Sequence, residues 1–89
     1  MPQVHFTAHL REVAPRGGFE SAGKTVRDAL ADVFASHPKL RSYVLDDQGR
    51  VRRHVTVFVD GEMMDRSEAL DVGLSPTSEV YVLQALSGG

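Results

Sequence analysis

The chain has no cysteine, no long apolar run and no excess of positive charge. Without cysteine it has neither a disulfide framework nor a thiolate metal site, and its four histidines are not clustered in sequence as metal ligands. No apolar run approaches the roughly 20 residues of a membrane span, and residues 1–20 lack the apolar centre of a signal peptide. We therefore expect a soluble, cytoplasmic protein with no metal site and no membrane partner.

The charge balance points to protein partners. Ten basic against twelve acidic side chains give a formal charge of −2, the wrong sign for a nucleic-acid binder. The length of 89 residues corresponds to one domain, and a domain of this size buries only about 60 to 65% of its unfolded surface. The sequence therefore predicts a single small core.

The first half of the chain changes from the pattern of a strand to that of a helix. Apolar and polar residues alternate over residues 4–10, and a Pro-Gly turn leads to a returning strand at residues 19–22. Thr25 occupies the N-cap position of a helix that begins at Val26, whose apolar residues recur at intervals of three and four. Pro38 should end this helix, because a proline disfavours helical geometry at the residue before it.

The second half returns to strands. Residues 43–45 and those from Val51 onward flank turn residues at 46–49 and predict a hairpin. Valine alternates with other residues over positions 55–59, which predicts the strongest strand of the chain. The Asp-Gly pair at 60–61 favours a type I′ turn into a returning strand, because both central positions of that turn need a positive φ.

The last third completes the predicted fold. A short helical turn is expected within residues 67–74, and a final strand over residues 79–83. The order of elements is strand, strand, helix, strand, strand. It predicts a two-layer α+β fold in which one helix covers one face of a mixed sheet.

Residues 18–25, Gly-Phe-Glu-Ser-Ala-Gly-Lys-Thr, match the phosphate-binding pattern G-x-x-x-x-G-K-[ST]. A working loop of this kind follows a buried parallel strand and needs further strands that carry a magnesium-binding acid. A chain this short lacks room for that sheet, and Phe19 belongs to the alternation of a strand. We therefore interpret the segment as strand, turn and helix cap, with Lys24 in solvent, and predict no nucleotide binding through it.

Two polar groups have alternative interpretations. His5 and His9 lie four residues apart on a strand, about 13 Å by its rise, so they cannot share a metal ion and are expected on the exposed sheet face. Arg50, Arg52 and Arg53 form a short basic stretch. Its usual meaning is a solvated surface, and its alternative is a docking site for an acidic partner.

No side chain is predicted to be catalytic. No arrangement of serine, histidine and acid is recognisable as a triad, although such groups need not be adjacent in sequence. Met63 and Met64 are expected to pack in the core or in the hairpin.

The alternation of the late strands predicts an apolar outer face. If the valines at 55–59 and 79–83 point at the helix, then Phe58, Tyr81 and Leu83 point to the opposite side of the sheet. Aromatic anchors of this kind commonly dominate interface energy. We predict that these three residues form a partner-docking face, the alternative being scattered exposed apolar residues with no partner.

The sequence ends in Gly88 and Gly89, one short spacer beyond the last predicted strand. Two glycines would occupy the final two positions by chance in only about 0.5% of chains. The pair is interpreted either as a frayed terminus or as a bare carboxylate on an extended arm that reaches another protein's active site. We expect a domain at residues 1–86 and a flexible tail at residues 87–89.

Four segments together resemble one protein family. They are residues 4–12, 25–30, 55–62 and 80–89. The chain is thereby similar to the ubiquitin-like sulfur carriers, the MoaD/ThiS family of the molybdopterin synthase small subunit and the thiamine-pathway sulfur carrier. Residues 43–53 are longer than in the most compact members and resemble the larger carriers, including one that delivers sulfur for cysteine synthesis. The resemblance implies the two-layer β-grasp fold of ubiquitin.

The resemblance also implies a chemistry for the tail. In this family an E1-like activating enzyme uses ATP to adenylate the terminal carboxylate, here that of Gly89, and a sulfur donor then converts it to a thiocarboxylate. The thiocarboxylate delivers sulfur to an acceptor enzyme in cofactor or amino-acid biosynthesis. Leu86, Ser87 and Gly88 would form the arm, and the chain would be a protein cosubstrate that binds no cofactor itself.

Two other functions remain open at the level of the sequence. A ubiquitin-like modifier would use the same activated Gly89 to form an isopeptide bond with a lysine. A non-covalent interaction module would use the outer sheet face and not the carboxylate.

Overall fold

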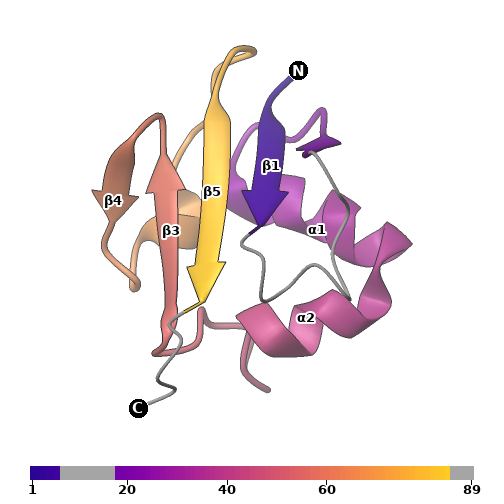
Figure 1. The fold of residues 1–89 in the computed structure, drawn as a ribbon, viewed down its shortest axis with the longest axis vertical. Helices are drawn as coiled ribbons and strands as arrows, with labels where there is room; N and C mark the ends of the chain where they lie inside the picture. Colours follow the sequence, from indigo (N-terminus) through magenta and orange to yellow (C-terminus); the bar gives the residue numbers. More distant parts are fainter. Residues whose placement is uncertain (7–17, 85–89) are drawn as a thin grey trace.

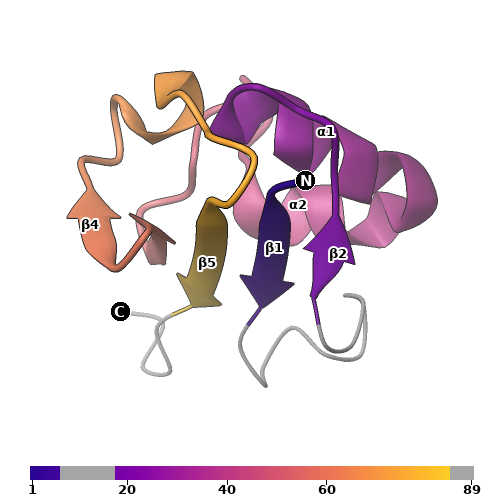
Figure 2. The same ribbon diagram turned by 90° about the horizontal axis from the view of Figure 1, so that it is seen from above.

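The structure is a computed structural model that describes residues 1–6 and 18–84. Its strands form one mixed sheet in the order β2-β1-β5-β3-β4 (Figure 1). Both α-helices lie on the same side of this sheet (Figure 2). The predicted two-layer α+β fold is therefore confirmed. The predicted domain boundary at residue 86 and the tail at 87–89 lie outside the described residues.

The first and last strands along the chain, β1 and β5, lie side by side in the interior of the sheet. The strands are β1 (Gln3–Phe6), β2 (Phe19–Glu20), β3 (Val55–Val59), β4 (Glu62–Met64) and β5 (Glu79–Gln84). β1 and β5 run parallel, whereas the β1–β2, β3–β5 and β3–β4 pairs are antiparallel. The predicted mixed sheet and its hairpins β1–β2 and β3–β4 are confirmed. Of the third predicted hairpin, around residues 46–49, the antiparallel pairing of Leu45 with Val51 is present. Positions 7–10 of the first predicted strand lie outside the described residues.

Helix α1 (Val26–Ser36) forms as its sequence predicts. The hydroxyl oxygen of Thr25 accepts a hydrogen bond from the Asp28 N–H at 3.2 Å, which satisfies one of the free donors of the first turn. Val26, Ala29, Leu30 and Val33 of the predicted stripe are buried, and Phe34, its last member, is partly buried against the core. The helix ends before Pro38, as expected.

Helix α2 (Pro38–Val44) differs from the prediction. The sequence predicts a strand at residues 43–45, but Tyr43 and Val44 belong to this second helix, so the expectation of a single helix is wrong. Proline fits the first position of a helix, where its missing N–H has no partner to lose. Leu40 and Val44, one helical turn apart, are both fully buried, and this tertiary packing overrides the strand propensity of the local sequence.

The predicted turns at residues 46–49 and 60–61 occur where expected, and the Pro-Gly turn of the first hairpin lies largely outside the described residues. Asp60 and Gly61 both have positive φ, 51° and 85°, as a type I′ turn requires. The Asp60 carboxylate also accepts a hydrogen bond from the Glu79 N–H at 2.9 Å, which ties this turn to the start of β5. The predicted helical turn appears as the 3₁₀-helix η2 (Ala69–Asp71).

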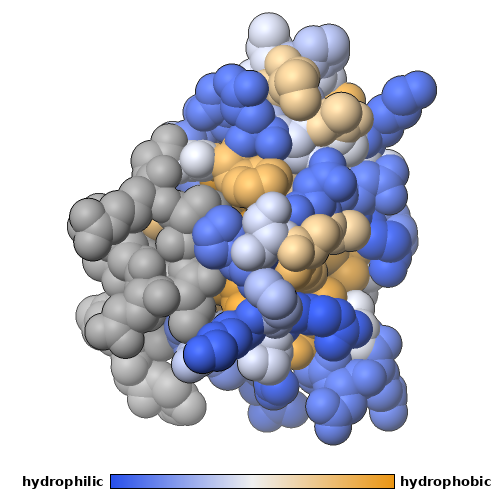
Figure 3. Space-filling model, turned by 90° about the vertical axis from the view of Figure 1, so that its right-hand side faces the viewer, coloured by the Kyte–Doolittle hydropathy of each residue, from blue (hydrophilic) through white to orange (hydrophobic). Residues whose placement is uncertain are grey.

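The core lies between the sheet and the two helices. The alternate residues Val55, Val57 and Val59 of β3 are buried, as are Val80 and Val82 of β5, which confirms the predicted inner face. Figure 3 views the side that lies at the right in Figure 1 and shows mainly hydrophilic residues with small hydrophobic patches between them. The alternate valines of β3 and β5 thus supply much of the core between the two layers.

Candidate functional site

The tail begins at a fixed point of the sheet. Gln84, the last residue of β5, pairs with Val55, the first residue of β3. Gly89 and the predicted arm residues Leu86, Ser87 and Gly88 lie outside the described residues. The structure thus places the base of the arm beside the first residue of β3, at one end of the strands.

Four side chains form a row across the outer face of the sheet. The register aligns Met63 of β4 with Phe58 of β3, Phe58 with Tyr81 of β5, and Tyr81 with His5 of β1. Directly opposed residues of neighbouring strands share a face, so all four lie opposite the helices. We call Met63, Phe58, Tyr81 and His5 the outer row.

The position of Tyr81 within the outer row is fixed by His5. The two rings stack with centroids 4.5 Å apart and an interplanar angle of 18°. His5 Nε2 lies 2.9 Å from Glu79 Oε1, on the same outer face. Tyr81 as a whole residue is nevertheless 44% exposed, so part of its surface is free to contact a partner.

The predicted docking residues share this face. Leu83 lies two residues beyond Tyr81 on β5 and pairs with Thr56, so it is about 7 Å nearer to the arm by the rise of a strand. Phe58 and Leu83 are half-buried. The structure therefore brings Phe58, Tyr81 and Leu83 together on one surface, and their docking role stays a prediction.

Met63 lies in the hairpin opposite Phe58 and Met64 packs against the core, which are the two placements that the sequence predicts. Met63 is 68% exposed and does not pack in the core. The two-residue turn at Asp60 and Gly61 determines this register. It pairs Val59 with the first residue of β4, and hence Phe58 with Met63.

The phosphate-binding pattern at residues 18–25 takes the predicted alternative form. Its start forms β2, an edge strand antiparallel to β1, and its end caps α1. A Cβ at Gly23 would lie 2.5 Å from the backbone nitrogen of Ala29, so glycine is needed for close packing against the helix. Lys24 is exposed. A structural reason thus accounts for the motif, and the absence of nucleotide binding stays a prediction.

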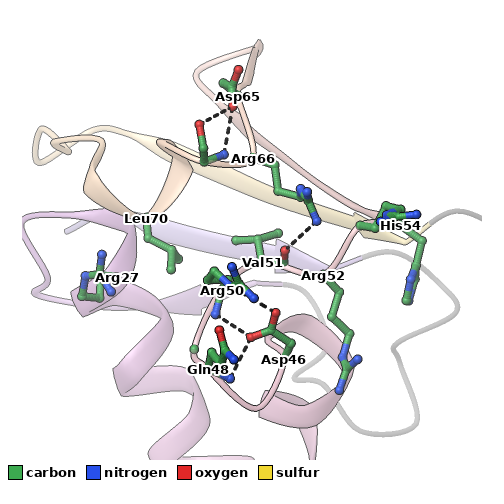
Figure 4. Close-up of a pocket in the computed structure, with 13 residues that line it drawn as sticks. Arg27, Asp46, Gln48, Arg50, Val51, Arg52, His54, Asp65, Arg66 and Leu70 are labelled. Carbon is green, nitrogen blue, oxygen red and sulfur yellow. Dashed lines mark hydrogen bonds and ion pairs between the residues drawn. The ribbon is translucent and has the colours of Figure 1, made fainter.

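A groove of about 810 Å³ forms a second candidate site (Figure 4). The predicted basic stretch Arg50, Arg52 and Arg53 lines it together with Arg27 from α1 and Arg66 from the loop after β4. Sequence reasoning missed the last two, because they are distant in the chain. We call the space lined by these five residues the arginine groove.

Two aspartates also line the arginine groove. The backbone N–H of Arg50 donates to the Asp46 carboxylate at 3.0 Å, and this bond is the main cause that lowers the pKa of Asp46. The Ser67 hydroxyl donates to Asp65 at 2.7 Å and lowers the pKa of that carboxyl. Both aspartates are therefore ionised at neutral pH.

The described residues offer no metal centre. Within residues 1–6 and 18–84, no three histidine, aspartate or glutamate side chains are grouped closely enough to hold a metal ion. Among the helices of the same residues, none is long and apolar enough to cross a membrane.

Comparison with known proteins identifies the family. The profile of the ThiS family matches residues 4–89. The chain is 35% identical over 65 residues to small archaeal modifier protein 1 of Haloferax volcanii, covering 73% of this chain and 70% of that protein. The crystal structure of SAMP1 from Haloferax volcanii superposes with a TM-score of 0.79 at 31% identity, over 99% of this chain and 98% of that one.

A chain of the BexX/CysO complex of Amycolatopsis orientalis matches with a TM-score of 0.86 at 22% identity, over 100% of both chains. At that identity the likeness concerns the fold alone, which is the ubiquitin-like β-grasp. The predicted fold family is confirmed. With a family match that extends over almost its whole length, the chain belongs to the ThiS family.

Proposed function

We propose that this chain is a ubiquitin-like sulfur carrier that acts as a protein cosubstrate through the carboxylate of Gly89. The observation that carries the proposal is the family match, which runs from Val4 to Gly89 and so includes both the β-grasp domain and the diglycine. In this proposal the chain works in the cytoplasm, catalyses no reaction and binds no cofactor of its own.

The chemistry begins with an unreactive group. A terminal carboxylate has a reference pKa of about 3.5, so it is ionised at neutral pH and resists attack by a nucleophile. An E1-like adenylating partner joins one carboxylate oxygen of Gly89 to the α-phosphorus of ATP and releases pyrophosphate. A sulfur donor at the oxidation level of hydrosulfide then attacks the carbonyl carbon, and AMP leaves with the former carboxylate oxygen. The product is the thiocarboxylate.

The arm must reach an active site that belongs to another protein. Gly88 and Gly89 have no side chains, so they can enter a narrow channel and adopt the backbone geometry that each partner requires. Leu86 and Ser87 connect them to β5. Because Gln84 is paired with Val55, the arm starts from a fixed base and only its short end has to be positioned.

The outer sheet face is the proposed docking surface for the activating enzyme. Phe58, Tyr81 and Leu83 lie on this face, and the last two belong to the strand that continues into the arm. A partner that covers these side chains therefore also receives the tail. The matching chain from Amycolatopsis orientalis belongs to a complex of BexX with CysO, which supports the expectation of a partner enzyme.

Deletion of Gly89 tests the proposal. The purified adenylating enzyme of the same host should release pyrophosphate from ATP with the full chain but not with the shortened one. Intact-mass measurement of the chain from its native host should show a fraction in which sulfur replaces one terminal oxygen. Equal thermal unfolding of both forms is the control for folding. Undiminished function of the shortened chain would show instead a non-covalent interaction module.

A lysine-conjugating modifier is the second candidate, because the relative at 35% identity is named a small archaeal modifier protein. The two functions share adenylation of Gly89 and diverge at the nucleophile, which is sulfur in one and a lysine amine in the other. Adducts of the chain on lysines of host proteins, without the thiocarboxylate, would establish the modifier and exclude the carrier. The sulfur-containing terminus without adducts would establish the carrier.

A further inference from the structure

The arginine groove concentrates positive charge on an acidic protein. It holds five of the eight arginines of the chain, from three segments that are distant in sequence. The same lining contains two negative charges, Asp46 and Asp65. Its net formal charge is therefore +3, whereas that of the whole chain is −2. The remainder of the molecule is thus strongly acidic, and the field of the groove is local.

The positive side chains surround an apolar floor. Val51 and Leu70 line the groove and are nearly buried. Figure 4 shows them between Arg27, Arg50 and Arg66, which come from different elements. Both residues belong to the hydrophobic core, so a bound peptide segment would contact mainly the charged rim and cover this floor.

The loop that supplies three of the arginines is held in place. Besides the N–H of Arg50, the Asp46 carboxylate accepts a hydrogen bond from the Gln48 N–H at 2.9 Å, and Arg52 Nε donates to the Ser42 carbonyl at 2.7 Å. Arg66 reaches the Val51 carbonyl at 3.5 Å. A loop with a pre-ordered backbone loses less entropy when a ligand binds, which favours recognition.

The ion pairs at the rim are easily exchanged. Arg27 pairs with Asp71 at 2.8 Å, but both side chains are more than half exposed. Arg50 lies 3.5 Å from Asp46 and is also exposed. Exposed pairs of this kind contribute little to stability, so an incoming carboxylate can replace a partner at small cost.

The groove opens beside the base of the arm. His54 lies at one end of the groove in Figure 4 and immediately precedes Val55, which pairs with Gln84. Arg27 lies at the other end in Figure 4. A protein that receives the arm therefore also lies against the groove.

We propose that the arginine groove binds an acidic peptide segment of the partner protein that receives the arm. Single carboxylates spaced along a chain can reach arginines that come from three separate segments, whereas a compact phosphate dianion contacts fewer of them at once. A nucleic acid is disfavoured by the net negative charge of the molecule. The identity of the partner rests on the proposed function, and the binding chemistry does not.

The first experiment tests the binding chemistry alone. A short polyglutamate peptide is titrated into the isotope-labelled full chain at low salt, with inorganic phosphate and a single-stranded oligonucleotide as competing probes, and backbone amide shifts are followed by NMR. We expect saturable shifts at residues 46–54 and 65–67, which are lost in Arg50→Glu/Arg53→Glu. The matched control Lys24→Glu/Lys39→Glu has the same change of charge at exposed sites outside the groove and should keep them.

The outcomes separate the alternatives. Shifts scattered over all basic residues, or unchanged in the Arg50→Glu/Arg53→Glu variant, would overturn the proposal, and so would a stronger response to phosphate or to the oligonucleotide. Both arginines are exposed, so the variant should fold, and its amide spectrum away from the groove verifies this.

The second experiment tests the link to activation. With the adenylating enzyme, the Arg50→Glu/Arg53→Glu variant should raise the KM for the carrier by about tenfold with little change in kcat, and the effect should shrink as salt is added. An unchanged KM, with normal adenylation of the unmodified chain, would refute the groove as the site of this partner and leave the proposed function intact. If the unmodified chain is not adenylated, the proposed function fails, and the NMR titration still decides what the groove binds.

Discussion

Replacing Tyr81 by alanine separates docking from folding, because Tyr81 and Val82 are neighbours on β5 that face opposite sides of the sheet. Tyr81 contacts His5 and Phe58 on the outer face, and each cross-strand pair contributes about 0.2 to 1 kcal/mol. Tyr81→Ala should therefore lower the free energy of unfolding by about 1 kcal/mol. Val82 is fully buried, so Val82→Ala removes core contacts and leaves a cavity, at a cost of about 2 to 3 kcal/mol.

Binding to the activating enzyme should show the reverse order. Truncation of an aromatic anchor costs about 2 kcal/mol or more, which corresponds to a roughly 30-fold weaker Kd. Val82→Ala should bind with nearly the Kd of the unmodified chain wherever it is folded. Urea unfolding followed by circular dichroism gives the stabilities, and isothermal titration with the enzyme gives the affinities. An unchanged Kd for Tyr81→Ala, or a loss of stability equal to that of Val82→Ala, would refute the assignment of this face.

Three further predictions follow from individual contacts. Gly23→Ala should destabilise the fold by about 1 to 3 kcal/mol, because its Cβ would lie 2.5 Å from the Ala29 backbone nitrogen. Gly73→Ala, whose Cβ would meet nothing nearer than 4.0 Å, is the matched control in thermal unfolding, and equal effects would contradict the packing argument. The folded pKa of Asp46 is lowered from 3.8, so its contribution to stability is present above that value and is lost as the pH falls through the folded pKa. Urea midpoints measured against pH should show a smaller acid-side loss for Asp46→Asn than for the unmodified chain, because Asp65 keeps its lowered pKa in both, and parallel curves would disprove the contribution of Asp46. In equilibrium dialysis, neither the unmodified chain nor Lys24→Ala should bind ATP. ATP binding that depends on Lys24 would support the phosphate-binding interpretation instead.

The sequence predicted correctly those elements that are marked by a strong local signal. Thr25 at the N-cap and the apolar stripe after it fix the start and the buried face of α1, and the Asp-Gly pair fixes the hairpin between β3 and β4. The failure at residues 43–45 has a physical cause. Tyr43 and Val44 have high strand propensity, but Val44 lies one helical turn after Leu40, and burial of both against the core decides for a helix.

The candidate sites were less predictable because they depend on contacts between distant segments. The stacking of His5 on Tyr81 requires β1 to lie beside β5, a pairing between the two ends of the chain that no local pattern specifies. In the same way, the basic stretch at residues 50–53 became a groove only when the fold brought Arg27 and Arg66 to it.

The two surfaces meet at the base of the arm and differ in what they can contribute. Tyr81 and Leu83 lead along the outer face to Gln84, and Gln84 pairs with Val55, which follows the arginine groove directly. Apolar anchors such as Tyr81 contribute mainly to affinity, whereas charges at a rim mainly accelerate association and fix orientation. For a partner that encloses the arm, loss of the outer row should therefore raise the dissociation rate at any salt concentration. Loss of the groove should lower the association rate, and only at low salt, because screening removes its long-range attraction.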